Sequence, residues 1–358
     1  MPASFQQLRA TLSSPLLAAF ALSAGFLAFV AWDQSHWWRV KEDYAFGWLV
    51  PALVVFVISD RWSRIVSAVQ GCMAAGSARA GGWSKWLLRG VAAGSLICGV
   101  LLFLLGAFYR AGAGTSQPGT LAITLGAVGI VLPLIFLNAP VPGDPAPANS
   151  DEGSGGGTGV SPVVRPLIQP EPGWDAPAMR CGLFSDARVR LTALFLFPVL
   201  VWLVSAPMVS AIESQLSLFL LRKVVTVVSF VFDLLGLPIE QQGNVLVLPT
   251  GKVGVEDACS GIRSLTGCLF AGSFLAAVFV ERLGQKILLV VAALGLAFLT
   301  NMVRGLFLTG WAYHYGPEAI GGKVHDIAGY SVLGLTVLGL LGLLPLFKWA
   351  TGESEKQA

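Results

Sequence analysis

The stretch SLTGCLFAGSFLAAVFVE, residues 264–281, carries no basic residue and a single acidic one at its last position. An apolar run of this length is what a helix needs to cross the ~30 Å hydrocarbon core of a membrane. The same criterion applied along the chain predicts eight spans, at about 15–32, 47–60, 87–108, 119–138, 191–211, 264–281, 286–303 and 327–347. Pro51 interrupts the second span, whose outer end we expect to continue through Tyr44 to Trp48.

The composition agrees with a membrane protein. Hydrophobic residues make up 55% and charged residues 12% of the 358 residues. The net charge of +3 is spread along the chain, which excludes a nucleic-acid-binding protein. We therefore predict an all-α polytopic membrane protein with about eight transmembrane helices, and with an interfacial helix and a short extended segment on the outer face. The first apolar run lacks a small-residue cleavage site and is interpreted as a transmembrane helix, not a removable signal peptide.

The predicted organisation has four parts. Residues 1–138 form an N-terminal membrane half with about four spans, and residues 139–190 a cytoplasmic linker. The linker is so rich in Pro, Gly and small polar residues that it cannot bury a core. Residues 191–350 form a C-terminal catalytic membrane half with about four spans, followed by a cytoplasmic tail at 351–358.

The segment 212–262 decides the topology. It contains enough apolar residues to cross, but Arg222 and Lys223 interrupt it. With eight spans and a cytoplasmic N-terminus, 14 of the 23 lysines and arginines lie in cytoplasmic segments and nine in outer ones, the bias that membrane proteins show. We therefore predict that 212–262 lies on the outer side, with a helix in the interface, an extended NVLVLP stretch (244–249) and a turn at Thr250-Gly251.

Three groups that suit acyl transfer then fall on one side of the membrane. Cys259, in EDACSGIRSL (256–265), immediately precedes the sixth span, Arg304 ends the seventh, and His325 precedes the eighth. A helix start and Arg263 would both lower the pKa of the Cys259 thiol. A histidine exchanges protons near neutral pH, and an arginine stabilises an oxyanion or binds a carboxylate. The trio predicts acyl transfer through a thioester.

Simpler interpretations stand beside this one. Cys259 is also explained as a packing residue, and Arg304 as a side chain that reaches the lipid headgroups. His314 is as good a candidate base as His325, with His36 a third.

The five cysteines, at 72, 98, 181, 259 and 268, form no CxxC pair, so neither a zinc site nor a disulfide framework is expected, and no metal or cofactor is predicted. Glu256 is interpreted as a helix-start residue.

The motifs resemble those of the exosortase and archaeosortase family of multi-pass membrane cysteine transpeptidases. The resemblance rests on ACSGIRSL (258–265), NMVR (301–304), HDIAG (325–329) and, in the N-terminal half, EDYAFGWLVP (42–51). It implies Cys259 as nucleophile, Arg304 as activating or oxyanion-binding residue and His325 as base, which favours His325 over His314. Supporting or substrate-binding residues would be Arg263, Glu256, Asn301 and Asp326. Phe46 departs from the family, which often has a histidine there, and the linker is longer than expected.

The resemblance also implies a substrate and a location. The partners would be exported proteins that bear a C-terminal motif, often Pro-Glu-Pro, then a transmembrane helix and a basic cluster, together with membrane lipid. Arg263 or Arg304 would bind the acidic residue of the motif. The enzyme would lie in the bacterial inner membrane with its site facing the periplasm, linked to exopolysaccharide and surface sorting. Two alternatives are a non-enzymatic component of polysaccharide export and a membrane acyltransferase.

Overall fold

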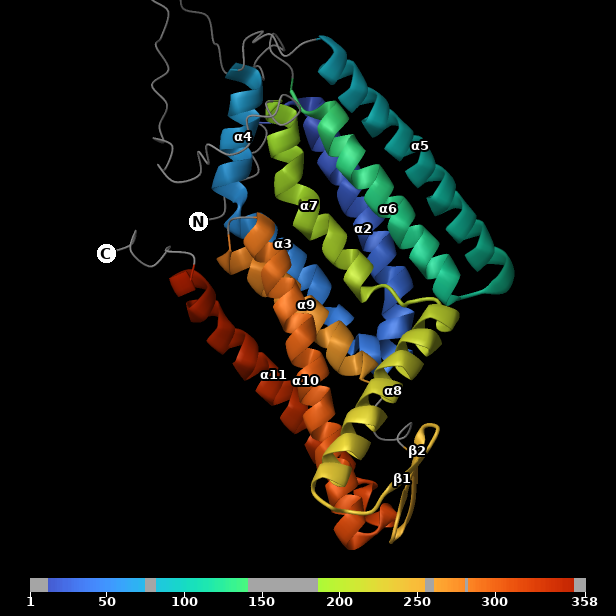
Figure 1. Cartoon of the computed structure of the whole chain (residues 1–358). Coiled ribbons are helices and arrows are strands. Elements are labelled where there is room, and N and C mark those ends of the chain that lie inside the picture. The colour runs from blue at the N-terminus through green and yellow to red at the C-terminus, as the bar shows by residue number, and fades with distance from the viewer. Residues whose placement is uncertain (1–11, 75–81, 141–185, 255–260, 281–282, 351–358) are drawn as a thin grey trace, which may run out of the picture. The chain divides into compact units, whose positions relative to one another are not determined.

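The computed structural model describes residues 12–74, 82–140, 186–254, 261–280 and 283–350, and helices dominate it (Figure 1). In the first half of the chain the helices are α2 (Ser14–Val40), the 3-10 helix η1 (Glu42–Leu49), α3 (Val50–Asp60), α4 (Trp62–Ala74), α5 (Gly82–Ala113) and α6 (Gln117–Asn138). In the second half they are α7 (Ala187–Ser205), α8 (Ser210–Leu234), α9 (Ile262–Phe279), α10 (Leu283–Tyr315), the 3-10 helix η3 (Pro317–Ile320) and α11 (Lys323–Ala350). The strands are β1 (Glu240–Gln242), β2 (Val245–Leu248) and β3 (Gly251–Gly254).

The predicted fold class is confirmed. Within the described residues, nine helical segments are long and apolar enough to cross a membrane. Each of the eight predicted spans lies largely within one of them, and the second combines η1 with α3 as expected. The ninth is α8, which we predicted to lie in the interface. The protein is therefore an all-α polytopic membrane protein with a small sheet.

Two elements differ from the sequence prediction. The span predicted at 191–211 ends as a helix at Ser205, because Pro207 lacks the backbone N–H that a continuing helix needs, and α8 starts afresh at Ser210. The helix α4 was not predicted at all, since its apolar residues are spaced for an amphipathic helix and not for a span. Most of the predicted linker, residues 141–185, and the tail at 351–358 lie outside the described residues.

The chain forms two compact units. The first is drawn from residues 1–28, 58–102 and 126–199. Its core is made by apolar side chains of α2, α4, α6 and α7, including Leu16, Ile65, Val131 and Leu191. Helices α5 and α6 come together at glycines, since a Cβ at Gly99 would lie 2.6 Å from the backbone of α6. Small residues of this kind let helices pack closely in a membrane.

The second unit comprises residues 29–57, 103–125 and 200–358 and contains all the predicted site residues. Here α10 packs against α8, α9 and α11. Helix α10 has 33 residues and is about 50 Å long, so it extends beyond a ~30 Å hydrocarbon core. The antiparallel sheet β1-β2-β3 covers its far end together with the end of α8 (Figure 1). Buried contacts there are made by Val228 and Phe232 of α8, Leu246 and Val253 of the sheet, and Leu308 and Ala312 of α10.

A buried polar network in the same unit positions η1. The Gln34 side chain of α2 donates to the Thr124 hydroxyl of α6 (2.9 Å) and accepts from the Ser205 hydroxyl of α7 (2.8 Å). Lys41 pairs with Glu213 of α8 at 2.6 Å. Side chains buried in this way need their hydrogen bonds, so the network holds the end of α2, and with it η1, in one place.

The position of α8 is testable by labelling. If α8 lies in the interface, Ser35→Cys on α2 and Gly243→Cys in the hairpin should react from the same side of the membrane with an impermeant maleimide. In a background without native cysteines, both should label in intact inverted vesicles only after permeabilisation. Ser67→Cys on α4 is the control and should label without it. Labelling of Gly243→Cys and Ser35→Cys from opposite sides would show that α8 crosses.

Candidate active site

Arg304 and His325 are in direct contact. Arg304 Nη2 lies 3.0 Å from His325 Nε2. Because a guanidinium only donates, His325 accepts through Nε2, so its ring is neutral with its proton on Nδ1. Gly329, one turn after His325 on α11, lies beside the guanidinium, and a Cβ there would be in ordinary van der Waals contact with Arg304 Nη2 at 3.7 Å.

His325 lies at the start of its helix, whereas Arg304, predicted to end its span, lies within α10, which continues for eleven residues to Tyr315. Arg304 comes 21 residues after Leu283, which is about 32 Å along α10 and therefore at the far boundary of a ~30 Å hydrocarbon core. His325 is the third residue of α11. A polar pair at this depth avoids the cost of a charge at the centre of the bilayer, and the pair is only partly buried, with the His325 side chain 37% exposed.

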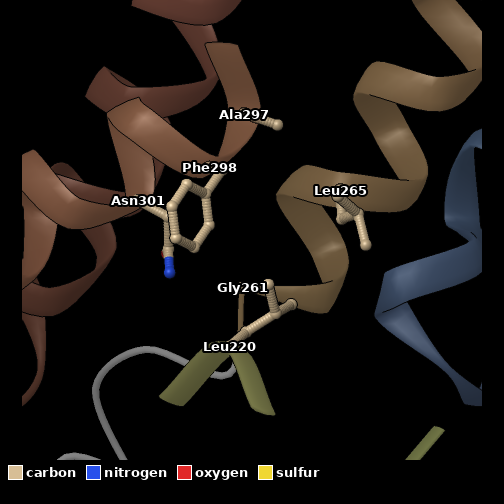
Figure 2. A pocket seen from close by; sticks show the side chains of 6 residues that line it. All are labelled: Leu220, Gly261, Leu265, Ala297, Phe298 and Asn301. Carbon is tan, nitrogen blue, oxygen red and sulfur yellow. The ribbon is translucent and has the colours of Figure 1, made fainter. Parts of the chain in front are cut away.

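Asn301 connects this pair to the start of α9. It lies one turn before Arg304 on α10 and is only 3% exposed. Gly261, the residue before α9, has a φ of +67°, and a Cβ on it would lie 2.8 Å from Asn301 Nδ2. Asn301 and Gly261 share a small pocket with Leu220 of α8, Leu265 of α9, and Ala297 and Phe298 of α10 (Figure 2).

Arg263 is paired within the chain. Its guanidinium lies 2.6 Å from a Glu42 carboxylate oxygen and 3.3 Å from one of Asp43, both in η1. The Thr266 hydroxyl also donates to the Asp43 backbone carbonyl at 3.0 Å. Arg263 therefore joins two segments that the resemblance singled out separately, EDYAFGWLVP and ACSGIRSL. This pairing was not predicted, because the acidic residues just before Tyr44 indicate a basic partner without indicating which one.

Position 46 lies at the same contact. The Phe46 ring packs on Phe270 of α9 with centroids 5.0 Å apart. The side chain that stands where family members often have a histidine thus contributes packing between η1 and α9.

Of the remaining predicted site residues, the structure describes Asp326 but not Cys259 or Glu256. Asp326 Oδ1 lies 3.7 Å from His325 Nδ1, too far for a hydrogen bond, and its side chain is 69% exposed. Cys259 and Glu256 lie outside the described residues, and Cys259 precedes Gly261 by two positions. The rival bases lie elsewhere: His314 is ten residues beyond Arg304 on α10, about 15 Å along the axis. His36 lies on α2, 3.4 Å from the Thr115 hydroxyl.

The described cysteines are not placed for nucleophilic chemistry. Cys72 is buried in α4, and burial raises the pKa of its thiol to about 11, so it is protonated at neutral pH. Cys268 is buried within α9, and Cys98 is exposed on the membrane span α5.

The fold and the site together define a polytopic helical membrane protein with an Arg–His pair between α10 and the start of α11. The family model described as transmembrane exosortase matches residues 181–342, a range that includes Cys259, Asn301, Arg304 and His325. This segment is therefore similar to the transmembrane exosortases, as the motifs of the C-terminal half indicated. No curated protein and no solved structure matches the sequence.

Replacing Gly261 by alanine should destabilise the protein. The left-handed backbone costs a non-glycine residue about 1–2 kcal/mol, and the new methyl group would also press on the Asn301 amide. Thermal unfolding in detergent should show the loss. Gly267→Ala, inside α9 with open space around its Cβ, is the matched control and should leave stability unchanged or raise it. Equal effects of the two changes would contradict the close approach of Gly261 and Asn301.

The Arg263 ion pair should contribute little to stability. Arg263 is 64% exposed and Glu42 is 79% exposed, so solvent screens their attraction. A double-mutant cycle with Arg263→Gln and Glu42→Gln, followed by unfolding in mixed micelles, should give a coupling free energy below about 1 kcal/mol. A coupling above about 2 kcal/mol would mean that the pair is buried in the membrane.

Proposed function

We propose that the protein is a membrane-embedded cysteine protease and transpeptidase. It would cleave C-terminal sorting tails of the Pro-Glu-Pro type from exported proteins through a thioester, and pass the new C-terminus to an acceptor. The observation that supports this best is the convergence of α9, α10 and α11 at one place: Arg304 contacts His325 at 3.0 Å, and Asn301, one turn away, borders Gly261.

Chain connectivity relates this site to the proposed nucleophile. Successive Cα atoms are 3.80 Å apart, so residue 259 can be no farther than about 7.6 Å from the Cα of Gly261. In the sequence, Cys259 precedes by two positions the glycine that borders Asn301. No described thiol competes with it for the role, since Cys72 and Cys268 are buried and Cys98 belongs to the first half of the chain.

The first half-reaction would proceed as follows. Once Arg304 has turned away, neutral His325 takes the proton of the Cys259 thiol and becomes imidazolium. The Cys259 thiolate then attacks the carbonyl carbon of the scissile peptide bond, and the carbonyl oxygen becomes an oxyanion. When the C–N bond breaks, the leaving amine takes a proton from imidazolium His325, and the released tail departs with a new N-terminus. The new C-terminus of the exported protein remains on Cys259 as a thioester.

The second half-reaction would release the product. An amine of the acceptor, or water, attacks the thioester carbonyl and gives its proton to neutral His325, and Cys259 leaves as a thiolate. An acceptor amine would yield transfer and water would yield hydrolysis. A site enclosed by helix ends limits access of water, which favours transfer.

Arg304 would have two partners in this cycle. In the structure it donates to His325 Nε2 and so occupies the lone pair that a base needs. For His325 to accept a proton at Nε2, Arg304 must turn to another acceptor. The oxyanion or the carboxylate of the tail motif provides one, so substrate binding would free the base. Arg263 is already paired with Glu42 and Asp43, which leaves Arg304 as the better candidate for the acidic residue of the tail.

The proposal includes a location. The enzyme would lie in the bacterial inner membrane with Arg304 and His325 facing the periplasm, and its partners would be exported proteins and membrane lipid. The charge distribution of the predicted topology supports this orientation.

The test is co-expression with a reporter that carries a Pro-Glu-Pro-type tail, with tail loss followed as a mass shift. Wild type should remove the tail, and Cys259→Ala should abolish removal. Arg304→Ala and His325→Ala should reduce the rate by about 10²-fold or more. His314→Ala is the matched control and should retain activity.

Other outcomes identify the alternatives. Tail removal that survives Cys259→Ala would eliminate the thiol mechanism. A labelled acyl group on Cys259 derived from lipid, without any protein substrate, would indicate an acyltransferase. Loss of export with no processing in any variant would indicate a non-enzymatic component of polysaccharide export.

A further inference from the structure

Helix α8 carries two adjacent cations that have no carboxylate partner. Arg222 and Lys223 are both exposed in the middle of the helix. Within the part of the chain that the structure describes, neither forms an ion pair with an acidic side chain. Lys223 Nζ instead lies 5.8 Å from the centre of the Phe219 ring. Two positive charges on the surface of α8 are therefore available to an anion from outside the chain.

Exposed aromatic rings share the face of α8 that carries these cations. Side chains four, seven and eleven positions apart return to one side of a helix, so Phe219, Lys223 and Phe230 form a stripe with Arg222 at its edge. Phe219 is 56% and Phe230 67% exposed. The opposite side of α8 is buried in the core with the sheet and α10, through Leu221, Val224, Val225, Val228 and Phe232. Exposed rings beside unpaired cations suit the boundary between lipid and water better than either water or hydrocarbon alone.

The contacts of α8 give the depth of the two cations. Leu220 lines the same small pocket as Asn301 of α10 (Figure 2). Asn301 comes 18 residues after Leu283, which is about 27 Å along α10. Arg222 and Lys223 follow Leu220 within one turn, so they lie at the outer boundary of a ~30 Å hydrocarbon core. Lipid phosphates begin at this depth.

We propose that this face of α8 binds the headgroup of an anionic phospholipid, with Arg222 and Lys223 on the phosphate and the Phe219 ring against the acyl chains. A headgroup of net negative charge complements two cations, whereas a zwitterionic headgroup brings a cation of its own. The inference goes beyond the proposed function, because the lipid would bind whether or not the protein cleaves sorting tails.

A lipid bound there would act on the start of α9 as well. A Cβ on Gly261 would lie 3.6 Å from Leu220 Cδ1, so the turn of α8 that precedes the cations also contacts the residue before α9. A ligand that binds only the folded state stabilises it. The anionic lipid should therefore hold α8 against α9 and raise the temperature of unfolding.

The binding test measures how much phosphatidylglycerol the full-length protein retains, by native mass spectrometry after release from nanodiscs of phosphatidylcholine and phosphatidylglycerol. The double variant Arg222→Gln/Lys223→Gln should bind phosphatidylglycerol about 25-fold more weakly than wild type, about fivefold for each cation removed. Lys252→Gln is the matched control, because Lys252 is an exposed cation of β3 beside a buried Val253. Phosphatidylglycerol should raise the unfolding temperature of wild type and of Lys252→Gln, but not that of the double variant.

A depth measurement does not depend on how the charge variants fold. In a background with the native cysteines replaced, Thr226→Cys on the exposed side of α8 is labelled with a nitroxide, and its collisions with oxygen and with a nickel chelate are compared. The nitroxide should lie about 15–22 Å from the bilayer centre, in the headgroup region. In a helix α8 that crossed the membrane it would lie within about 6 Å of the centre, because Thr226 is four positions from the middle of Ser210–Leu234.

The outcomes decide the lipid site separately from the proposed function, because neither measurement uses tail cleavage. Equal retention of phosphatidylglycerol by wild type and the double variant would overturn the lipid site. An equal loss in Lys252→Gln would overturn it too, since retention would then follow net charge and not this face of α8. A nitroxide depth outside the headgroup region would also overturn it.

Discussion

The close approach of α9 to α10 at Gly261 and Asn301 is the constraint on which the rest of the site depends. Only a residue without a Cβ, and one that adopts φ +67° at little cost, can stand opposite the Asn301 amide at this distance. A second close contact supports it further along, where a Cβ on Gly272 would lie 2.6 Å from the Cβ of Ala293. With α9 held against α10, the Arg304–His325 pair lies one helical turn from the point where the described chain enters α9.

The Arg304–His325 hydrogen bond has a chemical consequence of its own. An arginine would repel a protonated histidine beside it. Here the Arg304 guanidinium donates to His325 Nε2 at 3.0 Å, and only a neutral imidazole can accept that hydrogen bond. The protein thus holds the ring in one tautomer and rotamer while its basic nitrogen is occupied. Under the proposed function, a group that competes for the guanidinium would release a base that is already oriented, and the oxyanion of the reaction would be such a group. Coupling of this kind would link the appearance of negative charge to the availability of the base.

The hydropathy of the sequence was sufficient to predict the membrane-spanning helices. In lipid, backbone N–H and C=O groups must find their hydrogen bonds within the protein, and a helix provides them, so the eight apolar runs lie in eight helical segments. The amphipathic α4 and the pairing of NVLVLP into a sheet were missed, since both depend on which neighbour covers an apolar face and not on local composition. Within the site, the contact between Arg304 and His325 follows from topology, which placed both at helix ends on one side. The pairing of Arg263 with Glu42 and Asp43, 220 residues or more apart in sequence, does not follow from any local pattern.

Helix α8 shows how charge position decides between crossing a membrane and lying on it. Length and hydropathy qualify it to cross, yet Arg222 and Lys223 occupy the middle of its 25 residues and are exposed. At the centre of a bilayer each would cost about 2.5–3.5 kcal/mol, whereas at the interface each reaches the headgroups at little cost. The contacts of α8 fit the second case, since Glu213 near its start pairs with Lys41 at the end of α2, and its last turns pack on the sheet. These contacts are those we expect of a helix that lies in the interface and joins the end of one span to a sheet over the end of another.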